Sequence, residues 1–263
     1  MLIIMICFWN KYKNYIAPVI TTLVILAIWM VICATGTFSE YVLPSPGKVW
    51  NTFLKMIEAG DIWEDIIISL LRVLKGFVIA FLLAFLLGVL TSIAPGSRVW
   101  YDFLVQFFRN VPPLSLIPLL ILWYGIGETS KTIIIVLASF FPIYLNIVKG
   151  ITGCDERLLE VGEVFAYTRR EKLFGIILPY ATADILVGMR IGLGYSWRAI
   201  IGAEMVAAAS GLGHMILFAQ QMSRTDKVII GIILIGTIGY LSDWIFGLII
   251  KRVLKGFGDN GWQ

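Results

Sequence analysis

Long stretches without a charged residue limit the fold of this chain more than any other feature of its sequence. The first runs from Asn14 to Ser39, and its core at 15–34 is long enough to cross a bilayer as a helix. Of the 263 residues, 59% are hydrophobic and 14% charged, whereas soluble domains are roughly half apolar and about a quarter charged. A soluble domain of this size could not bury so much apolar surface, so we expect an integral membrane protein.

The charge-poor stretches predict an all-α, polytopic membrane protein with about six transmembrane helices. After 15–34, further spans are expected at 69–94, 103–123, 132–148, 185–207 and 228–250. We expect one transmembrane domain over 1–263, with a peripheral first span and a five-span core at 69–250. The segment 208–227 fits a loop, a re-entrant segment or a short surface helix.

The third span contains residues that interrupt helices. Asn110, Pro112 and Pro113 lie near its start and predict a break or a kink there. The break either exposes backbone groups to a cavity or is a simple bend near the membrane surface.

Lysine and arginine residues outside the spans predict the orientation of the chain. With six spans, both termini lie on one side of the membrane. The cations on that side are Lys11, Lys13, Arg98, Lys149, Arg157, Arg169, Arg170, Lys172, Lys251, Arg252 and Lys255, against Lys48, Lys55, Lys131, Arg224 and Lys227 on the other. Because cytoplasmic segments are enriched in Lys and Arg, both termini are predicted to be cytoplasmic. The segment 149–183 is then the longest cytoplasmic loop.

The sequence offers no pattern for a cofactor or a nucleic acid. The net charge of +4 comes from cations that flank apolar runs, which indicates membrane orientation. The three cysteines (Cys7, Cys33 and Cys154) are scattered, and the single His214 cannot form a metal site alone. No GxxxxGK[ST] phosphate-binding loop is present in the sequence. We therefore expect no nucleic-acid partner, no metal and no cofactor bound by this chain.

The loop 149–183 has the pattern of an amphipathic helix that ends at Pro179. Its apolar residues recur at helical spacing, with acidic and basic residues between them in equal number. A helix that lies on lipid headgroups would need a basic face, so the balanced charge favours docking onto a protein partner. A helix lying on lipid is the alternative.

Part of this loop resembles the EAA loop of ABC importer permeases. In that family Glu-Ala-Ala is followed after three residues by Gly, and after nine more by Ile-x-Leu-Pro. Here the spacing is intact, but Val161 and Gly162 replace the two alanines, and Ala166 replaces the glycine. The resemblance implies an ATPase-coupling site made by Glu160, Val161, Gly162, Ala166, Ile176, Leu178 and Pro179.

Other parts of the chain resemble the nitrate, sulfonate, taurine and bicarbonate branch of these permeases. The matching blocks are Val111–Leu114, Ile117–Glu128, Phe141–Tyr144, Trp197-Arg198 and Ala203–Met205, within a similarity from about Pro44 to Leu254. The resemblance implies a type I ABC importer permease fold and a transport subunit rather than an enzyme. It also implies a small, anionic solute of the sulfonate, taurine or nitrate kind. An aromatic or vitamin-precursor solute, imported by the same mechanism, is the alternative.

The same resemblance implies a set of partners in the cell membrane. Two copies of a separate ATPase subunit, which would hold ATP and Mg, are expected below the permease. An extracytoplasmic solute-binding protein is expected on the other side, and a second permease copy would complete a homodimer surrounded by membrane lipid.

Ionisable residues at membrane depth each need a physical reason, because they are costly there. Arg190 and Asp243 lie at similar depths in the last two spans and are predicted to form a structural ion pair. Arg72 and Lys75 are predicted to be anchors whose charged ends reach the membrane surface. Gly188 and Gly192 predict close approach of another helix, for which a second permease copy is one candidate.

The remaining polar residues at depth are candidates for the translocation pathway. Arg198 lies near mid-membrane, where it would meet an anionic solute or pair with Glu204. Glu204 would act as a gate or as a pairing residue, and Trp197 shares its helical face. Asn110 and Pro113 complete the predicted pathway set.

Two other classes of protein compete with this interpretation. A secondary transporter or channel would work without an ATPase and would not need a loop of EAA spacing. An intramembrane enzyme would need a catalytic group at membrane depth, and the sequence has no paired aspartates, no HExxH and no Ser/Lys/His set.

Overall fold

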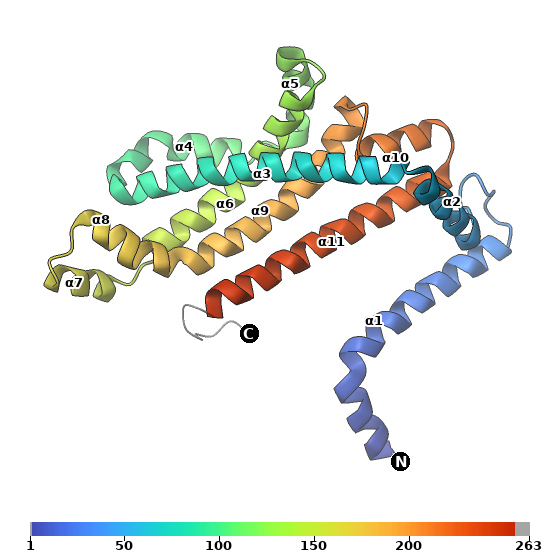
Figure 1. Cartoon of the computed structure of the whole chain (residues 1–263), viewed down its shortest axis with the longest axis horizontal. Coiled ribbons are helices and arrows are strands. Elements are labelled where there is room, and N and C mark those ends of the chain that lie inside the picture. The colour runs from blue at the N-terminus through green and yellow to red at the C-terminus, as the bar shows by residue number, and fades with distance from the viewer. Residues whose placement is uncertain (1, 256–263) are drawn as a thin grey trace. The chain divides into compact units, whose positions relative to one another are not determined.

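The computed structural model describes residues 2–255, with the backbone alone for 2–16 and Pro95. Lys11 and Lys13, which entered the orientation argument, therefore have side chains outside the described part. The described residues form helices and the turns that join them, without a strand. In chain order the elements are α1 (Leu2–Ala34), α2 (Pro46–Ala59), α3 (Asp61–Ile93), η1 (Pro95–Ser97), α4 (Arg98–Phe108), η2 (Pro113–Leu116), α5 (Ile117–Tyr124), α6 (Glu128–Thr152), α7 (Glu156–Val164), α8 (Arg169–Lys172), η3 (Leu173–Ile177), α9 (Leu178–Ala207), α10 (Leu212–Gln221) and α11 (Thr225–Lys255) (Figure 1).

The expected membrane protein with about six spans is confirmed. Five helical stretches of the described chain are long and apolar enough to cross a membrane, and they are Ala17–Ala34, α3, α6, Arg169–Ala207 and α11. The pair formed by α4 and the segment Pro113–Tyr124 is a sixth candidate, bent by 87°. The break predicted in the third span is therefore present.

The break has a local cause in the sequence. Pro112 has an extended backbone with φ −61° and ψ 123°, and Pro113 then begins the short helix η2. A residue that precedes a proline is disfavoured in the helical conformation, so two successive prolines stop α4 and force a new start. The side-chain amide of Asn110 donates to the carbonyl of Gln106 at 2.7 Å and satisfies one of the carbonyls left free at the end of α4.

The chain divides into two compact parts. The smaller part comprises Met1–Ile62 and Ile216–Ile232, and the larger comprises Trp63–Met215 and Ile233–Gln263. In the smaller part, Ser45 caps α2 by accepting from the amide of Lys48 at 3.3 Å. The buried Thr52 of α2 donates to Asp226 at the start of α11 at 2.8 Å, which ties these two helices together.

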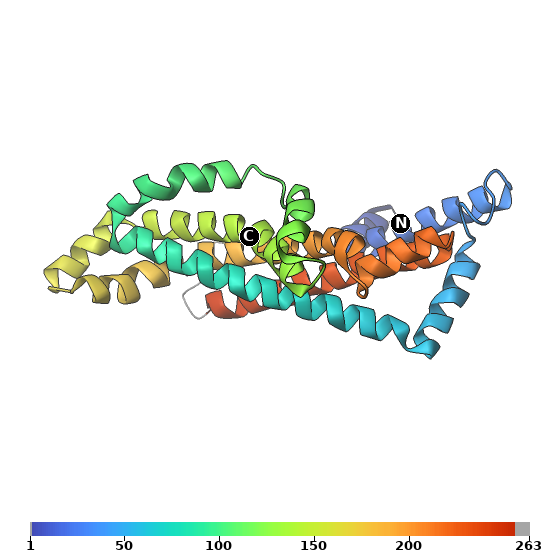
Figure 2. The same cartoon turned by 90° about the horizontal axis from the view of Figure 1, so that it is seen from above.

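Close helix packing in the larger part depends on small residues. A side-chain carbon at Gly192 of α9 would lie 2.5 Å from Ile143 of α6, and one at Gly188 would lie 2.6 Å from Asn146. These two glycines therefore pack against α6 of the same chain. The expectation that a second permease copy packs against them is wrong. Figures 1 and 2 show α6 and α9 side by side, with α3 running along them.

Small residues on α3 serve the same purpose. Ala80 and Ala84 are fully buried, and a side-chain carbon at Gly88 would lie 2.4 Å from Ile147 of α6. Lipid offers no hydrophobic drive for helix association, so close backbone approach supplies the van der Waals contact instead. These contacts fix α3, α6 and α9 as the frame that positions the sites below.

Segment 208–227, for which the sequence fits a loop, a re-entrant segment or a short helix, contains a short helix. Leu212–Gln221 forms α10, and its residues Leu212, Met215 and Ala219 are buried.

Candidate functional site

The loop that follows α6 folds into a helical hairpin. Asp155 accepts from the amide of Arg157 at 3.0 Å and starts α7. At the other end, Ala166 has a left-handed backbone with φ +53°. The amide of Tyr167 donates to Gly162 at 2.8 Å and that of Ala166 donates to Glu163 at 2.9 Å, which together make a Schellman motif. The helix therefore ends here.

The prediction of one amphipathic helix that ends at Pro179 is wrong. The chain turns after α7 and restarts at Thr168, which forms a capping box with Glu171. From Arg169 the helix continues through the π-helical turn η3 into α9, with Pro179 in the first turn of α9. A proline is tolerated there because the neighbouring π-helical turn already changes the hydrogen-bonding register.

Two residues of the EAA-like pattern meet inside the hairpin. Gly162 is buried, and a side-chain carbon at this position would lie 2.8 Å from Cδ1 of Ile176. The carboxylate of Glu163 accepts from Nζ of Lys172 at 2.8 Å, and this ammonium group lowers the pKa of Glu163. The glycine that replaces the family's alanine is thus the residue that lets α7 lie against η3.

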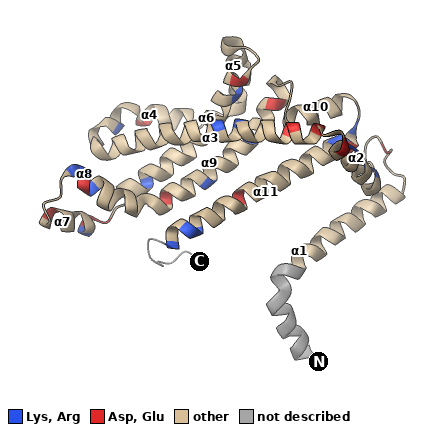
Figure 3. Cartoon of the chain, viewed as in Figure 1, with Lys and Arg blue, Asp and Glu red and all other residues tan. Residues whose placement is uncertain are grey.

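The outer surface of this hairpin exposes a group of apolar residues. Its exposed large hydrophobic residues are Leu158, Val161, Val164, Phe165, Tyr167 and Phe174. Glu160 is exposed as well, and it has no ion pair within the described residues. Figure 3 shows that charged residues also gather on α7 and α8. Leu178 and Pro179 lie beneath this surface, half-buried where η3 joins α9.

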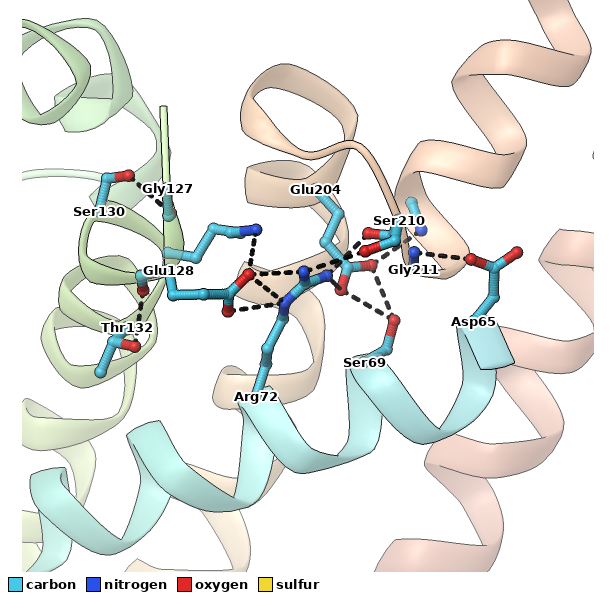
Figure 4. Close-up of polar contacts among 12 residues, drawn as sticks. Asp65, Ser69, Arg72, Gly127, Glu128, Ser130, Thr132, Glu204, Ser210 and Gly211 are labelled. Atoms are coloured by element: carbon cyan, nitrogen blue, oxygen red, sulfur yellow. Dashed lines mark hydrogen bonds and ion pairs between the residues drawn. The ribbon is translucent and has the colours of Figure 1, made fainter. Parts of the chain in front are cut away.

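A second polar cluster lies inside the larger part, at Glu204 (Figure 4). The side chain of Glu204 is fully buried and accepts from Ser69 Oγ at 2.8 Å and from Arg72 Nη1 at 2.8 Å. The amide of Gly213 donates to the same carboxylate at 3.0 Å. Glu204 thus has its partners, within the described chain, on α3 and at the start of α10. The predicted pairing of Glu204 with Arg198 is wrong.

Arg72 extends this cluster to α6. It is 8% exposed, and its Nη2 donates to Glu128 at 2.7 Å, while Nζ of Lys131 donates to the same carboxylate at 2.7 Å. Nη1 of Arg72 also donates to the carbonyl of Ser210 at 2.7 Å. The prediction that Arg72 is an anchor reaching the membrane surface is therefore wrong. It joins three helices in a network with two positive and two negative charges.

Sequence reasoning missed this network although one signal was available. Asp65, Ser69 and Arg72 are spaced by four and three residues and so share one face of α3. Asp65 accepts from the amide of Gly211 at 2.7 Å. Gly211 has φ +107°, and a side-chain carbon there would lie 2.4 Å from Oε1 of Glu204, so only glycine fits.

The structure brings Arg190 and Asp243 together. Nε of Arg190 donates to Oδ1 of Asp243 at 2.7 Å and Nη2 donates to Oδ2 at 2.5 Å. Both side chains are about half exposed. This bidentate geometry joins α9 to α11.

Trp197 and Arg198 have different surroundings on neighbouring positions of α9. Trp197 is buried, its Nε1 donates to the carbonyl of Ile235 at 3.0 Å, and its ring fits against Gly239. Arg198 is exposed, with its guanidinium carbon 5.8 Å from the centre of the Tyr195 ring. Both line a cavity of about 630 Å³ between α9 and α11.

Two of the predicted pathway residues lie elsewhere. Asn110 and Pro113 are at the bend between α4 and α5 and do not line this cavity. Leu114, next to Pro113, fits against Gly202 of α9.

Among the described residues, no group of three or more His, Cys, Asp or Glu side chains is placed to hold a metal ion.

Known proteins of similar sequence are transport permeases. Over 246 residues the chain is 36% identical to SsuC of Bacillus subtilis, named as an aliphatic sulfonate transport permease, covering 94% of this chain and 89% of SsuC. It is 30% identical to the taurine transport system permease protein TauC of Escherichia coli, covering 95% and 93% of the two chains. It is 31% identical to the nitrate import permease protein NrtB of Synechocystis, covering 87% and 85%.

The fold is similar to that of solved importers. An inward-facing structure of the MetNI methionine ABC transporter matches with a TM-score of 0.60 and 17% sequence identity, covering 74% of this chain and 95% of that one. Residues 76–255 match the family described as binding-protein-dependent transport system inner membrane component. This chain therefore belongs to that family and is a multi-pass membrane permease subunit of an ABC importer.

Proposed function

We propose that this permease imports a small anion of the sulfonate, taurine or nitrate kind. The observation that carries this proposal is the similarity over most of the chain to permeases named for these solutes. Arg198 supports it, because an exposed guanidinium beside a cavity at membrane depth suits an anionic cargo. Trp197 and Arg198 would line the pathway, with the Arg190–Asp243 pair as its structural support.

The bend at Asn110 and Pro113 has a separate place in this proposal. The bend would set the positions of α4 and α5 beside the pathway, and its residues would not contact the solute. Glu204 would contribute as the buried support of α9 rather than as a contact for the solute, because its carboxylate already has three partners.

The experiment that tests the solute class uses the complete importer. The permease, its ATPase and its solute-binding protein are reconstituted in vesicles, and ATP hydrolysis is measured with taurine, ethanesulfonate, nitrate, methionine and thiamine in turn. Stimulation by one of the first three solutes is expected. Stimulation by methionine or thiamine alone would contradict the proposed class.

The coupling site is proposed to be the outer surface of the α7 hairpin. Two ATPase copies would each receive one such surface, with Glu160 and Val161 at the contact and Gly162, Ala166, Ile176, Leu178 and Pro179 shaping the hairpin beneath. Exposed apolar residues on a short helix and in the turn that follows it suit docking into a groove of another protein.

The test of this coupling is co-purification with the ATPase. Val161→Asp places a charge in the contact and is expected to reduce recovery of the ATPase at least tenfold. Lys48→Gln, on the smaller part and outside the hairpin, serves as the control and should leave recovery unchanged. Full recovery with Val161→Asp would contradict docking at this surface.

The arrangement in the membrane completes the proposal. Residues 1–263 act as one permease domain, with 15–34 as a peripheral span and 69–250 as the core, in a homodimer with cytoplasmic termini. The excess of Lys and Arg on one side supports this orientation. The solute-binding protein would deliver its cargo from the opposite side.

A further inference from the structure

Charged side chains are exposed at membrane depth where α9 lies beside α11. Arg190 and Asp243 are 46% and 49% exposed, and Arg198 is exposed as well. Contact of a charged group with the hydrocarbon core is costly, so such groups face water or protein. This surface of the larger part is therefore expected to border water or protein rather than lipid.

Arg190, Gly194 and Arg198 form a row along this surface of α9. Residues four apart share a helix face and lie about 6 Å apart along the axis. The two arginines thus flank a position without a side chain. A carbon atom added at Gly194 would meet no atom within 4 Å apart from its chain neighbours and the nearby backbone of α9 itself. The space beside Gly194 is open, unlike that at Gly188 and Gly192 on the packed side of the same helix.

Two cavities meet at this row. One has a volume of about 730 Å³ and the other about 630 Å³, and the residues that line both are Arg190, Gly194, Arg198 and Asp243. Binding sites for small molecules typically have volumes of roughly 300–1,000 Å³. Either cavity is therefore large enough for a small organic anion.

The row has more positive than negative charge. Arg190 is paired with Asp243, whereas Arg198 has no carboxylate partner among the described residues and lies near the Tyr195 ring. Arg190 uses Nε and Nη2 for Asp243. Its Nη1 donates no hydrogen bond within the described part of the chain. The whole guanidinium of Arg198 and the two N–H groups on Nη1 of Arg190 are thus available on the two sides of Gly194.

We infer that the space beside Gly194 is an oxyanion subsite, in which Arg198 and Nη1 of Arg190 hold the sulfonate, carboxylate or nitrate oxygens of the solute. This inference rests on the proposed function, because the occupant is the transported anion. Guanidinium groups bind oxyanions through paired N–H donors. Asp243 holds Arg190 in place and offsets one positive charge, which suits a site that the solute must leave again.

The charge of the subsite is tested by the reactivity of a cysteine placed in it. Gly194→Cys is introduced into a permease without its own thiols (Cys7→Ser, Cys33→Ser and Cys154→Ala), and the complete importer is reconstituted in vesicles. The cysteine is labelled with two water-soluble methanethiosulfonates, one carrying a sulfonate and one carrying a trimethylammonium group. A cysteine at Gly47, in open surroundings within the smaller part, is the reference position.

The sulfonate reagent is expected to be favoured at Gly194→Cys. The ratio of the two labelling rates should exceed that at Gly47→Cys by about tenfold, because a cation-lined cleft concentrates anions. Arg198→Gln should abolish this excess, Arg198→Lys should retain most of it, and Arg98→Gln, on α4, should leave it unchanged. Ethanesulfonate at millimolar concentration should slow labelling at Gly194→Cys but not at Gly47→Cys.

Two results would overturn the inference. One is a cysteine at 194 that reacts with neither reagent, which would place lipid or protein against Gly194. The other is a rate ratio that Arg198→Gln does not change. Neither result concerns the solute panel, so this subsite can fail while the complete importer still responds to taurine or ethanesulfonate. Conversely, an importer that responds to none of the anions removes the proposed function even where the sulfonate reagent is favoured.

Discussion

Nη1 of Arg72 donates to Oε1 of Glu204 across 2.8 Å, and both side chains are buried between α3 and α9. The two residues lie 132 positions apart in the chain. Ser69 and the amide of Gly213 donate to the other oxygen of Glu204, and the remaining Arg72 donors reach Glu128 and Ser210 (Figure 4). Every charge in this network is therefore paired inside the larger part.

Removing one partner of this pair should destabilise the permease strongly. Arg72→Met leaves Glu204 buried without its cation, and we expect a loss of about 3–5 kcal/mol, seen as a lower Tm of the purified protein. The double variant Arg72→Met with Glu204→Leu removes both charges and should recover much of that loss. Lys48→Met breaks an exposed pair with Glu40 and should leave Tm unchanged. A double variant less stable than Arg72→Met would contradict this account.

The backbone at Ala166 predicts a stabilising substitution. Alanine in the left-handed conformation costs roughly 1–2 kcal/mol, a cost that glycine does not have, although glycine also gains freedom in the unfolded chain. The substitution Ala166→Gly should therefore slow hydrogen exchange severalfold at the backbone amides of residues 166 and 167. The substitution Ala166→Val should accelerate it. Faster exchange in Ala166→Gly would show that this turn is not strained.

The contact between Gly162 and Ile176 predicts a pair of compensating substitutions. Gly162→Val should push Ile176 away, displace α7 and lower ATP hydrolysis stimulated by the solute-binding protein. Adding Ile176→Ala creates room for the new side chain and should restore much of the activity. The single variant Ile176→Ala is the control. Failure of the double variant to recover, with the protein still folded, would contradict this packing.

The subsite beside Gly194 predicts that a larger side chain there changes the preference of the importer for solutes of different size. Gly194→Val would fill the open space between Arg190 and Arg198 while leaving both charges in place. Uptake of the larger ethanesulfonate should then fall more than uptake of nitrate. The measurement is the ratio of the two uptake rates in vesicles. An equal fall for both solutes would instead indicate that the valine disturbs α9 as a whole.

The spans and their break could be predicted because they depend on local sequence. A bilayer requires about 20 apolar residues for each helix, and successive prolines stop a helix wherever they occur. The Arg190–Asp243 pair could also be predicted, since both residues lie at similar depths in adjacent spans. The helix that packs against Gly188 and Gly192 could not be predicted, because small residues permit close approach without specifying the partner.

The buried network and the hairpin could not be derived in the same way. Arg72 near the end of a predicted span has the same local pattern as an anchor at the membrane surface, and only the packing of α3 on α9 buries it. The turn at Ala166 uses a residue that is disfavoured in the left-handed region, so the only local signal is the Thr168–Glu171 capping pair that follows it. Its hydrogen bonds to Gly162 and Glu163 are local and lie within the last turn of α7.

The most direct test of ATP-driven anion import is solute uptake by vesicles with and without the ATPase. Vesicles that hold the permease, the ATPase and internal ATP, with the solute-binding protein added outside, should accumulate labelled taurine, ethanesulfonate or nitrate. Vesicles that hold the permease alone, with the same binding protein and solute gradient, should take up none above the level of empty vesicles. Uptake by the permease in vesicles that lack any ATPase would contradict this account.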